Sequence, residues 1–182
     1  MSRFQTLTPS SLGREDFVAA FADIYEHSPW VADKAYEMGI DETCNEVERL
    51  HERMANILLS ADRDTQLALI NAHPDLAGKA AMRGELTASS TSEQAGAGIQ
   101  DCSPEEFERF VRLNEGYKAK FGFIFVMAVR GSNRHQILAS FKERIHNSPE
   151  QEFQRALSEI NKIALFRLQA CLLYTSPSPR DS

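Results

Sequence analysis

His73 and Glu93 are the two side chains whose types and surroundings best fit acid–base chemistry in this sequence. His73 stands before a proline in the string HPDLA, and the residue before a proline is disfavoured in a helix, so its imidazole can turn toward a site. An imidazole gains and loses a proton near neutral pH, which makes His73 a natural proton donor. A histidine at the end of an apolar helix is more often structural, and the residue alone leaves this alternative open.

Glu93 lies in the polar string STSEQ. Ser90 and Glu93 have the spacing of a capping box, so one interpretation is simply the start of a helix. The functional interpretation is that Thr91, Ser92 and Gln94 add hydroxyl and amide groups beside the free N–H groups of a helix N-terminus, where a polar or anionic ligand binds well. The two interpretations are compatible, because a capping residue can also position a catalytic carboxylate.

The apolar run FIFVMAV, residues 123–129, is the one candidate for an extended segment. It is bounded by Gly122 and Gly131, and without a second such run it cannot build a sheet. Its backbone N–H and C=O groups therefore need other partners, and a ligand rich in ureide groups could supply them. The segment is a candidate wall of a binding site.

Composition excludes several classes of protein. The net charge of −6 argues against a generic nucleic-acid binder, and no apolar run is as long as a membrane span. The N-terminal residues lack the apolar stretch of a secretory signal, so we expect a cytoplasmic protein without nucleic-acid or membrane partners. The histidines lack close metal-ligand spacing, phosphate loops are missing, and Cys44, Cys102 and Cys171 lie far apart. We expect neither a metal nor an organic cofactor.

The elements that must position these residues are predicted to be helices, from apolar spacings of three and four. We expect one helix capped by Ser10 or Ser11 that runs to the break at Pro29, and short helical turns joined by loops from residue 73 to 102. The other predicted helices cover residues 29–38, 41–58, 62–70, 103–121, 133–146 and 150–172. The prediction is an all-α fold: a compact, irregular helical bundle with one short extended apolar segment at about residues 123–129.

The length of 182 residues fits a single domain, which we place over residues 1–172. The remaining segment, LYTSPSPRDS, has no helical periodicity, and its Ser-Pro repeat cannot continue the preceding helix. Residues 173–182 are expected to be a disordered tail, or one that is not native to the protein.

Several separated strings together resemble one enzyme family. YEHSPWVA, HPDLAGKAA, SSTSEQAGAG, LNEGYKAKFGFIFVMAVRG and INKIALFRLQ occur in the order and spacing of the 2-oxo-4-hydroxy-4-carboxy-5-ureidoimidazoline (OHCU) decarboxylase family, over roughly residues 10 to 170. The resemblance implies a compact all-α enzyme that converts this product of urate oxidation into (S)-allantoin with loss of carbon dioxide. One departure is Ile124, where members of the family often have proline.

The resemblance also implies roles for individual residues. His73 corresponds to the catalytic proton donor, and Glu93 is catalytic as well as substrate-binding. Arg167 corresponds to an arginine that helps to hold the substrate, although on sequence alone it could equally pair with Glu159 or Glu152 on a solvated face. The other implied substrate-binding residues are Pro74, Ser90, Thr91, Ser92, Gln94, Phe125, Val126, Met127, Ala128 and Val129.

The implied reaction needs a sink for the electrons that the departing carboxylate leaves, a task often given to a cofactor. Here the conjugated ring of the substrate can accept them, which fits a chain without cofactor motifs. Two other functions stay open: a helical module that binds a ureide without changing it, and a hydrolase in which His73 and Glu93 activate water. In each case the partner is a small molecule, and the protein is expected to be a monomer or a homodimer.

Overall fold

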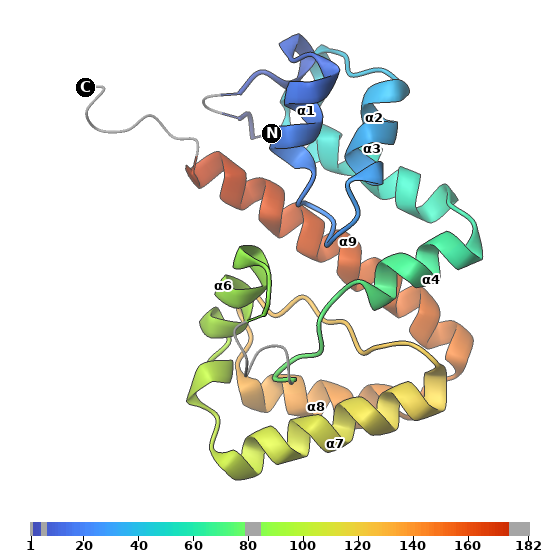
Figure 1. The fold of residues 1–182 in the computed structure, drawn as a ribbon, viewed down its shortest axis with the longest axis vertical. Helices are drawn as coiled ribbons and strands as arrows, with labels where there is room; N and C mark the ends of the chain where they lie inside the picture. The colour runs from blue at the N-terminus through green and yellow to red at the C-terminus, as the bar shows by residue number, and fades with distance from the viewer. Residues whose placement is uncertain (1, 5–6, 79–84, 175–182) are drawn as a thin grey trace. The chain divides into compact units, whose positions relative to one another are not determined.

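The structure is a computed structural model that describes residues 2–4, 7–78 and 85–174 (Figure 1). Within these residues the regular elements are helices, joined by turns and one isolated antiparallel bridge between Arg3 and Glu46. The all-α prediction is therefore confirmed. The chain divides into two compact units: unit 1 comprises Met1–Leu69 and Asn161–Ser182, and unit 2 comprises Ile70–Ile160. The single domain over residues 1–172 stays a prediction.

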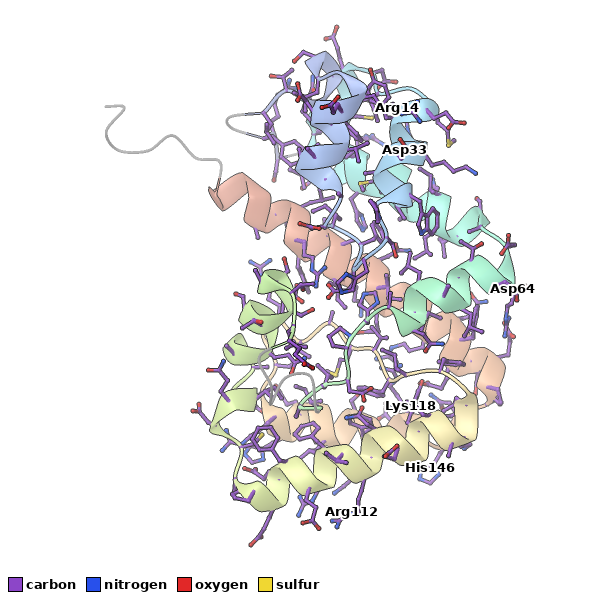
Figure 2. All side chains as sticks on the ribbon, viewed as in Figure 1. Arg14, Asp33, Asp64, Arg112, Lys118 and His146 are labelled. Carbon is purple, nitrogen blue, oxygen red and sulfur yellow. The ribbon has the colours of Figure 1, made fainter. Side chains whose placement is uncertain are left out.

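Unit 1 is built from amphipathic helices and two 3-10 turns. Phe17 packs against Phe21 and Tyr36, with ring centroids 4.9 and 5.7 Å apart. At the surface Arg14 pairs with Asp33 at 2.9 Å, joining the first two helices (Figure 2). The elements are η1 (Pro9–Ser11), α1 (Arg14–Phe21), α2 (Trp30–Glu37), η2 (Glu42–Asn45), α3 (Val47–Ser60), most of α4 (Arg63–Asn71) and the C-terminal half of α9 (Pro149–Tyr174).

The first helix is shorter than predicted at both ends. Neither serine caps it, because the Ser10 hydroxyl accepts from Asn45 Nδ2 at 2.9 Å and the Ser11 hydroxyl donates to the Thr8 carbonyl. Gly13 is the N-cap instead, and α1 ends at Phe21, well before Pro29. The competing partner Asn45 comes from a distant part of the sequence, so local capping rules could not anticipate it.

Unit 2 contains α6 (Ala88–Gly96), η3 (Ile99–Asp101), α7 (Pro104–Phe121), α8 (Arg134–Arg144) and the first half of α9. The predicted boundaries of α7 are confirmed: Ser103 and Glu106 form a capping box, and Gly122 ends the helix with a left-handed φ of 81°. Asn133 likewise caps α8 through a reciprocal bond with Gln136. Short-range side-chain to backbone bonds define both helices.

The helices α7 and α8 run in the same direction, and this requires an extended connection. Glu106 near the start of α7 pairs with Arg134 at the start of α8 at 3.2 Å, whereas Lys120 near the end of α7 donates to the Ile145 carbonyl just after α8. With 18 residues, α7 is about 27 Å long, and the chain must return over this length. Residues 123–133 span about 36 Å when extended and about 17 Å as a helix. Figure 1 shows this long return without regular structure, which confirms the predicted extended segment at 123–129.

The last helix, α9, begins at Pro149 and ends at Tyr174, two residues beyond the predicted end. The rest of the predicted tail, residues 175–182, lies outside the described residues, as do residues 79–84 of the predicted loop region. No helix among the described residues is long and apolar enough to cross a membrane.

Candidate functional site

The chain leaves α4 at Asn71, and His73 stands in the loop that follows. His73 is buried, with 8% of its surface exposed, and its N–H donates to the Ile70 carbonyl at 3.2 Å. The next turn of the loop contains Ala77 in a left-handed conformation with a φ of 54°, which is costly for a residue with a side chain. Surrounding groups must therefore hold this loop in place.

Two buried carboxamides bind three successive residues of the loop. Gln94 Oε1 accepts from the Ala77 N–H at 3.0 Å, and Gln94 Nε2 donates to the Asp75 carbonyl at 3.3 Å. Asn114 Nδ2 of α7 donates to the Leu76 carbonyl between them at 2.9 Å. Because Gln94 follows Glu93 directly in α6, these bonds place the helical turn that carries Glu93 beside the loop that carries His73.

A partly exposed ion pair adds a third attachment to the same loop. Lys118 of α7, labelled in Figure 2, pairs with Asp75 Oδ2 at 2.9 Å. The exposed fractions of the two side chains are 38% and 25%. At this exposure the pair contributes little to stability by itself, in the range of about 0–1 kcal/mol. Its main effect is to fix the direction of the Asp75 side chain.

The helix that carries Glu93 starts earlier than the capping-box interpretation predicted. Thr87 is the N-cap, and its hydroxyl accepts from the Ser90 N–H at 3.2 Å. The interpretation of Ser90 as the cap is therefore wrong, because Thr87 offers the same hydroxyl three residues upstream. The Thr91 N–H already bonds to the Thr87 carbonyl at 2.9 Å, so Thr91 to Gln94 lie inside the helix and away from its free N–H groups. Ser90 and Gln94 are buried, Glu93 is half-buried, and Thr91 and Ser92 are exposed.

The 123–129 segment is held at every second residue by a side chain from another element. The Ile124 N–H donates to Asn71 Oδ1 at 3.2 Å, a bond that a proline at this position could not make. Arg144 Nη1 donates to the Val126 carbonyl at 2.7 Å, and the Ala128 N–H donates to Glu159 Oε1 at 2.9 Å. Since Asn71 is two residues from His73, the segment also begins beside the His73 loop.

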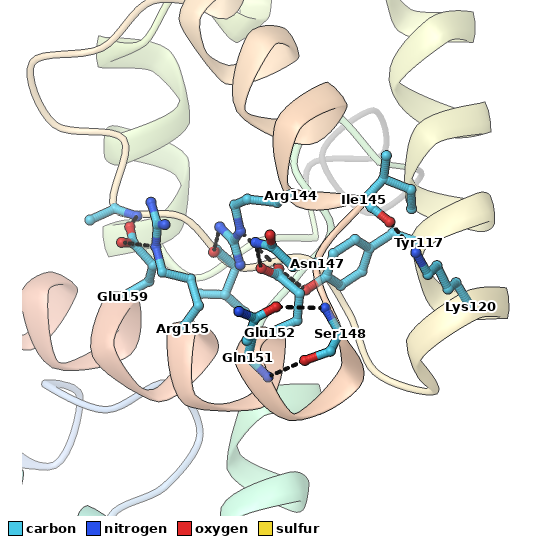
Figure 3. A network of polar contacts seen from close by, with 12 residues as sticks. Tyr117, Lys120, Arg144, Ile145, Asn147, Ser148, Gln151, Glu152, Arg155 and Glu159 are labelled. Atoms are coloured by element: carbon cyan, nitrogen blue, oxygen red, sulfur yellow. Dashed lines mark hydrogen bonds and ion pairs between the residues drawn. The ribbon is translucent and has the colours of Figure 1, made fainter.

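A fully buried charge network supports this segment (Figure 3). Arg144 pairs with Glu152 at 2.9 Å, and neither side chain has any exposed surface. Tyr117 donates its hydroxyl to the same carboxylate oxygen at 2.5 Å, and Asn147 donates to the other one at 2.8 Å. Burial, together with the bond to Glu152, raises the pKa of Tyr117 well above the ordinary tyrosine value.

Arg167 lies in the part of α9 that belongs to unit 1. Its guanidinium pairs with the buried Glu26 at 2.9 Å and donates to the Asp23 carbonyl at 3.1 Å. The alternative of a solvated pair with Glu159 or Glu152 is wrong, because Arg167 is buried and pairs with Glu26. Binding of a substrate by Arg167 stays a prediction.

Among residues 2–4, 7–78 and 85–174, no group of three His, Cys, Asp or Glu side chains could hold a metal ion. Cys44 and Cys102 are free thiols, and Cys44 is buried. Partial burial raises the pKa of the Cys102 thiol, with a further contribution from Glu106. Independence from metals and cofactors stays a prediction.

Sequence reasoning did not find the side chains that hold the site together: Asn71, Asn114, Lys118, Arg144 and Glu159. A signal was present for two of them, because Asn114 and Arg144 interrupt or end helical faces that are otherwise apolar, between Phe110 and Tyr117 and after Phe141. A polar residue on a buried face needs a partner, but the sequence does not say which one.

A family model described as OHCU decarboxylase matches residues 10–169. The protein named 2-oxo-4-hydroxy-4-carboxy-5-ureidoimidazoline decarboxylase from Halalkalicoccus jeotgali is 38% identical over 100% of this chain and 96% of its own length. A protein of the same name from Haloferax volcanii is 42% identical over 86% of this chain and 89% of its own length.

Solved structures also resemble this one. The crystal structure of an (S)-allantoin synthase superposes with a TM-score of 0.72 at 29% identity, over 92% of this chain. This chain covers 53% of that protein and thus spans about half of its length. An OHCU decarboxylase crystallised in the presence of (S)-allantoin gives a TM-score of 0.67 over 85% of this chain and 98% of its own, and at 23% identity it supports the fold alone. Family model and relatives together cover nearly the whole sequence, and the chain belongs to the OHCU decarboxylase family.

Proposed function

We propose that this protein decarboxylates OHCU to (S)-allantoin in urate breakdown, with a site in unit 2 formed by the His73 loop, the Glu93 turn of α6 and the 123–129 segment. One observation carries the proposal. The three segments come from distant parts of the sequence, and polar side chains link the His73 loop to each of the other two. The buried Gln94 links the loop to α6, and the exposed Asn71 links it to the 123–129 segment. An acid–base pair beside a rigid wall of backbone groups is the arrangement that this reaction needs.

The proposed mechanism has two steps. The bond between the ring carbon and the carboxylate breaks, carbon dioxide leaves, and the electron pair moves into the conjugated imidazoline ring. The carbon that lost the carboxylate bears the hydroxyl and becomes a carbonyl carbon as that hydroxyl gives up its proton. His73 delivers a proton from one face to the neighbouring ring carbon, which bears the ureido group, so a single enantiomer forms. Glu93 orients the His73 imidazole or a substrate hydroxyl. The ring is the electron sink, which supports the expectation that no cofactor takes part.

The remaining proposed contacts divide by their surroundings. The 123–129 segment contributes mainly backbone groups, and Pro74 lines the site beside His73. Gln94 acts through the loop that it holds. Ser90, Thr91 and Ser92 are on the same helix as Glu93, and Arg167 is proposed to bind a substrate carboxylate through a two-pronged charge-assisted bond. The partner is this small molecule, and we propose a cytoplasmic protein.

The test is circular dichroism during urate oxidation, with OHCU generated in the cuvette and purified protein added. Enzymatic decarboxylation gives an optically active product, whereas spontaneous decay gives a racemate. Replacing His73 by Asn or Glu93 by Gln should abolish the optical activity, because acid–base groups contribute about 10²- to 10⁴-fold. The exposed His146 provides a matched control, and His146→Asn should behave as the parent protein does.

Three results would contradict parts of the proposal. A folded His73→Asn variant that still makes (S)-allantoin at the parent rate would remove His73 as the proton donor. Ring opening without release of carbon dioxide would indicate a hydrolase. Binding of the ureide with neither reaction would indicate a binding module.

A further inference from the structure

The three attachments of the 123–129 segment alternate along the chain. They engage the N–H of Ile124, the C=O of Val126 and the N–H of Ala128. In an extended chain the N–H and C=O of one residue point to one side, and those of the next residue point to the other. The backbone groups of Phe125 and Met127 therefore point away from the three attachments.

We propose that Arg144 and Glu159 are positioning residues that decide which backbone groups of this segment meet the substrate. They hold Val126 and Ala128 on the supporting side, so the N–H and C=O groups of Phe125 and Met127 face the substrate. A ureide carries N–H and C=O groups side by side and can pair with such an edge. This inference rests on the proposed decarboxylase function and adds which residues of the 123–129 segment direct their backbone groups toward the substrate.

Arg144 is suited to this role because its guanidinium is planar and carries several donors in fixed directions. One donor binds Glu152 (Figure 3), and another binds the Val126 carbonyl. The guanidinium also lies 4.2 Å from the centre of the Phe125 ring. Phe125 in turn stacks on Phe141, with ring centroids 3.7 Å apart. Arg144 thus contacts both the Phe125 ring and the Val126 carbonyl.

Glu159 divides its two oxygens between two tasks. Oε1 accepts from the Ala128 N–H at 2.9 Å, and Oε2 pairs with Arg155 at 2.9 Å. Arg155 is 42% exposed and Glu159 only 3%, so the pair reaches from the surface to the buried wall. The ion pair can therefore be removed while the wall bond is kept.

The experiment compares Glu159→Gln with Glu159→Met. Both variants lose the charge opposite Arg155, but glutamine keeps an oxygen that can accept from the Ala128 N–H, and methionine does not. We expect Glu159→Gln to stay within about threefold of the parent in kcat/KM. Glu159→Met should lose about 10- to 100-fold, since small misplacements at a reacting centre have effects of this size. Arg155→Gln breaks the same ion pair without touching the wall, and it should leave kcat/KM unchanged.

The readouts are kcat and KM for freshly generated OHCU, the optical purity of the product, and amide hydrogen exchange at Ala128, with far-ultraviolet circular dichroism to establish folding. Faster exchange at Ala128 in Glu159→Met, together with lower kcat and lower optical purity, supports the inference. Arg144→Lys keeps the charge beside Glu152 but lacks the planar guanidinium, whose separate donors bind Glu152 and the Val126 carbonyl. It should also lower kcat and optical purity, and it is the test variant if Glu159→Met does not fold.

Two outcomes would overturn the inference while the parent protein is active. One is a folded Glu159→Met with parent kcat, KM and optical purity. The other is an equal loss in Glu159→Gln and Glu159→Met, which would assign the effect to the charge and not to the wall bond. An inactive parent protein is a different result, because it overturns the proposed function and, with it, the inference that rests on it.

Discussion

Replacement of Gln94 by Met tests how the His73 loop is held. The change keeps the length of the side chain but removes both bonds, to the Ala77 N–H at 3.0 Å and to the Asp75 carbonyl at 3.3 Å. Each bond contributes about 1 kcal/mol net, and a buried N–H left without a partner costs about 1–3 kcal/mol. Ala77 is fully buried, so the second effect applies. We expect the free energy of unfolding to fall by about 2–4 kcal/mol.

The assay is urea denaturation followed by circular dichroism, combined with steady-state kinetics on the same preparations. Gln94→Glu keeps an acceptor for the Ala77 N–H but places a carboxylate oxygen beside the Asp75 carbonyl, so it should lose stability as well. Gln100 is exposed on η3, and Gln100→Met is the matched control, with an expected change within about 0.5 kcal/mol. Both Gln94 variants should lower kcat, because the loop that positions His73 is loosened.

The opposite pattern would refute this reasoning. If Gln94→Met is as stable as the parent and raises only KM, then the carboxamide contacts the substrate directly, as the sequence resemblance implied. The loop would then need no support from α6, and the left-handed Ala77 would have to be stabilised by Asn114 and Lys118 alone.

Three further predictions concern the charged groups. Tyr117→Phe removes a buried hydroxyl bond to the Glu152 carboxylate and should lower the free energy of unfolding by about 1.5–3 kcal/mol in urea titrations, with kcat little changed. Arg167→Lys keeps the charge but not the two-pronged geometry, so it should raise KM at least tenfold if Arg167 binds the substrate. An unchanged KM would assign Arg167 to the structural pair with Glu26. The Ser103 N–H, and then Arg134, lower the pKa of Glu106 below its ordinary value of 4.5. The contribution of Glu106 to stability is therefore present above about pH 4.5 and is lost as the pH falls through the folded-state pKa. Glu106→Gln should weaken the acid dependence of Tm.

The elements that the sequence predicts best are those defined by local contacts. The capping box of Ser103 and Glu106 closes within four residues, and Gly122 ends the helix by its own backbone conformation. The start of α6 was predicted three residues late, because Thr87 and Ser90 both offer a capping hydroxyl and only the structure shows which one is used. Local rules identify candidates for a cap, and packing chooses among them.

The candidate site is predictable in its chemistry but not in its support. His73, Glu93 and the 123–129 segment follow from residue type, string resemblance and apolar patterning. The side chains that hold them find their partners far along the chain: Asn114 binds a carbonyl 38 residues away, and Arg144 binds one 18 residues away. No periodicity or spacing rule contains such pairings, because each side chain has many acceptors within reach until the fold is known.

The buried polar groups of unit 2 are better explained by positioning than by stability. Arg144 and Glu152 have no exposed surface, and replacing such a pair by apolar residues of similar volume is often neutral or stabilising. A fold that needed only a core could fill this place with leucine or methionine. What an apolar pair cannot do is hold the Val126 carbonyl on one side of an extended chain. In the triple variant Tyr117→Phe/Arg144→Met/Glu152→Met no tyrosine hydroxyl is left unpaired, so the free energy of unfolding should fall by no more than about 1–3 kcal/mol, for the Val126 carbonyl that loses its partner. Its kcat should fall, and a stable triple variant with parent kcat would show that the network serves the fold alone.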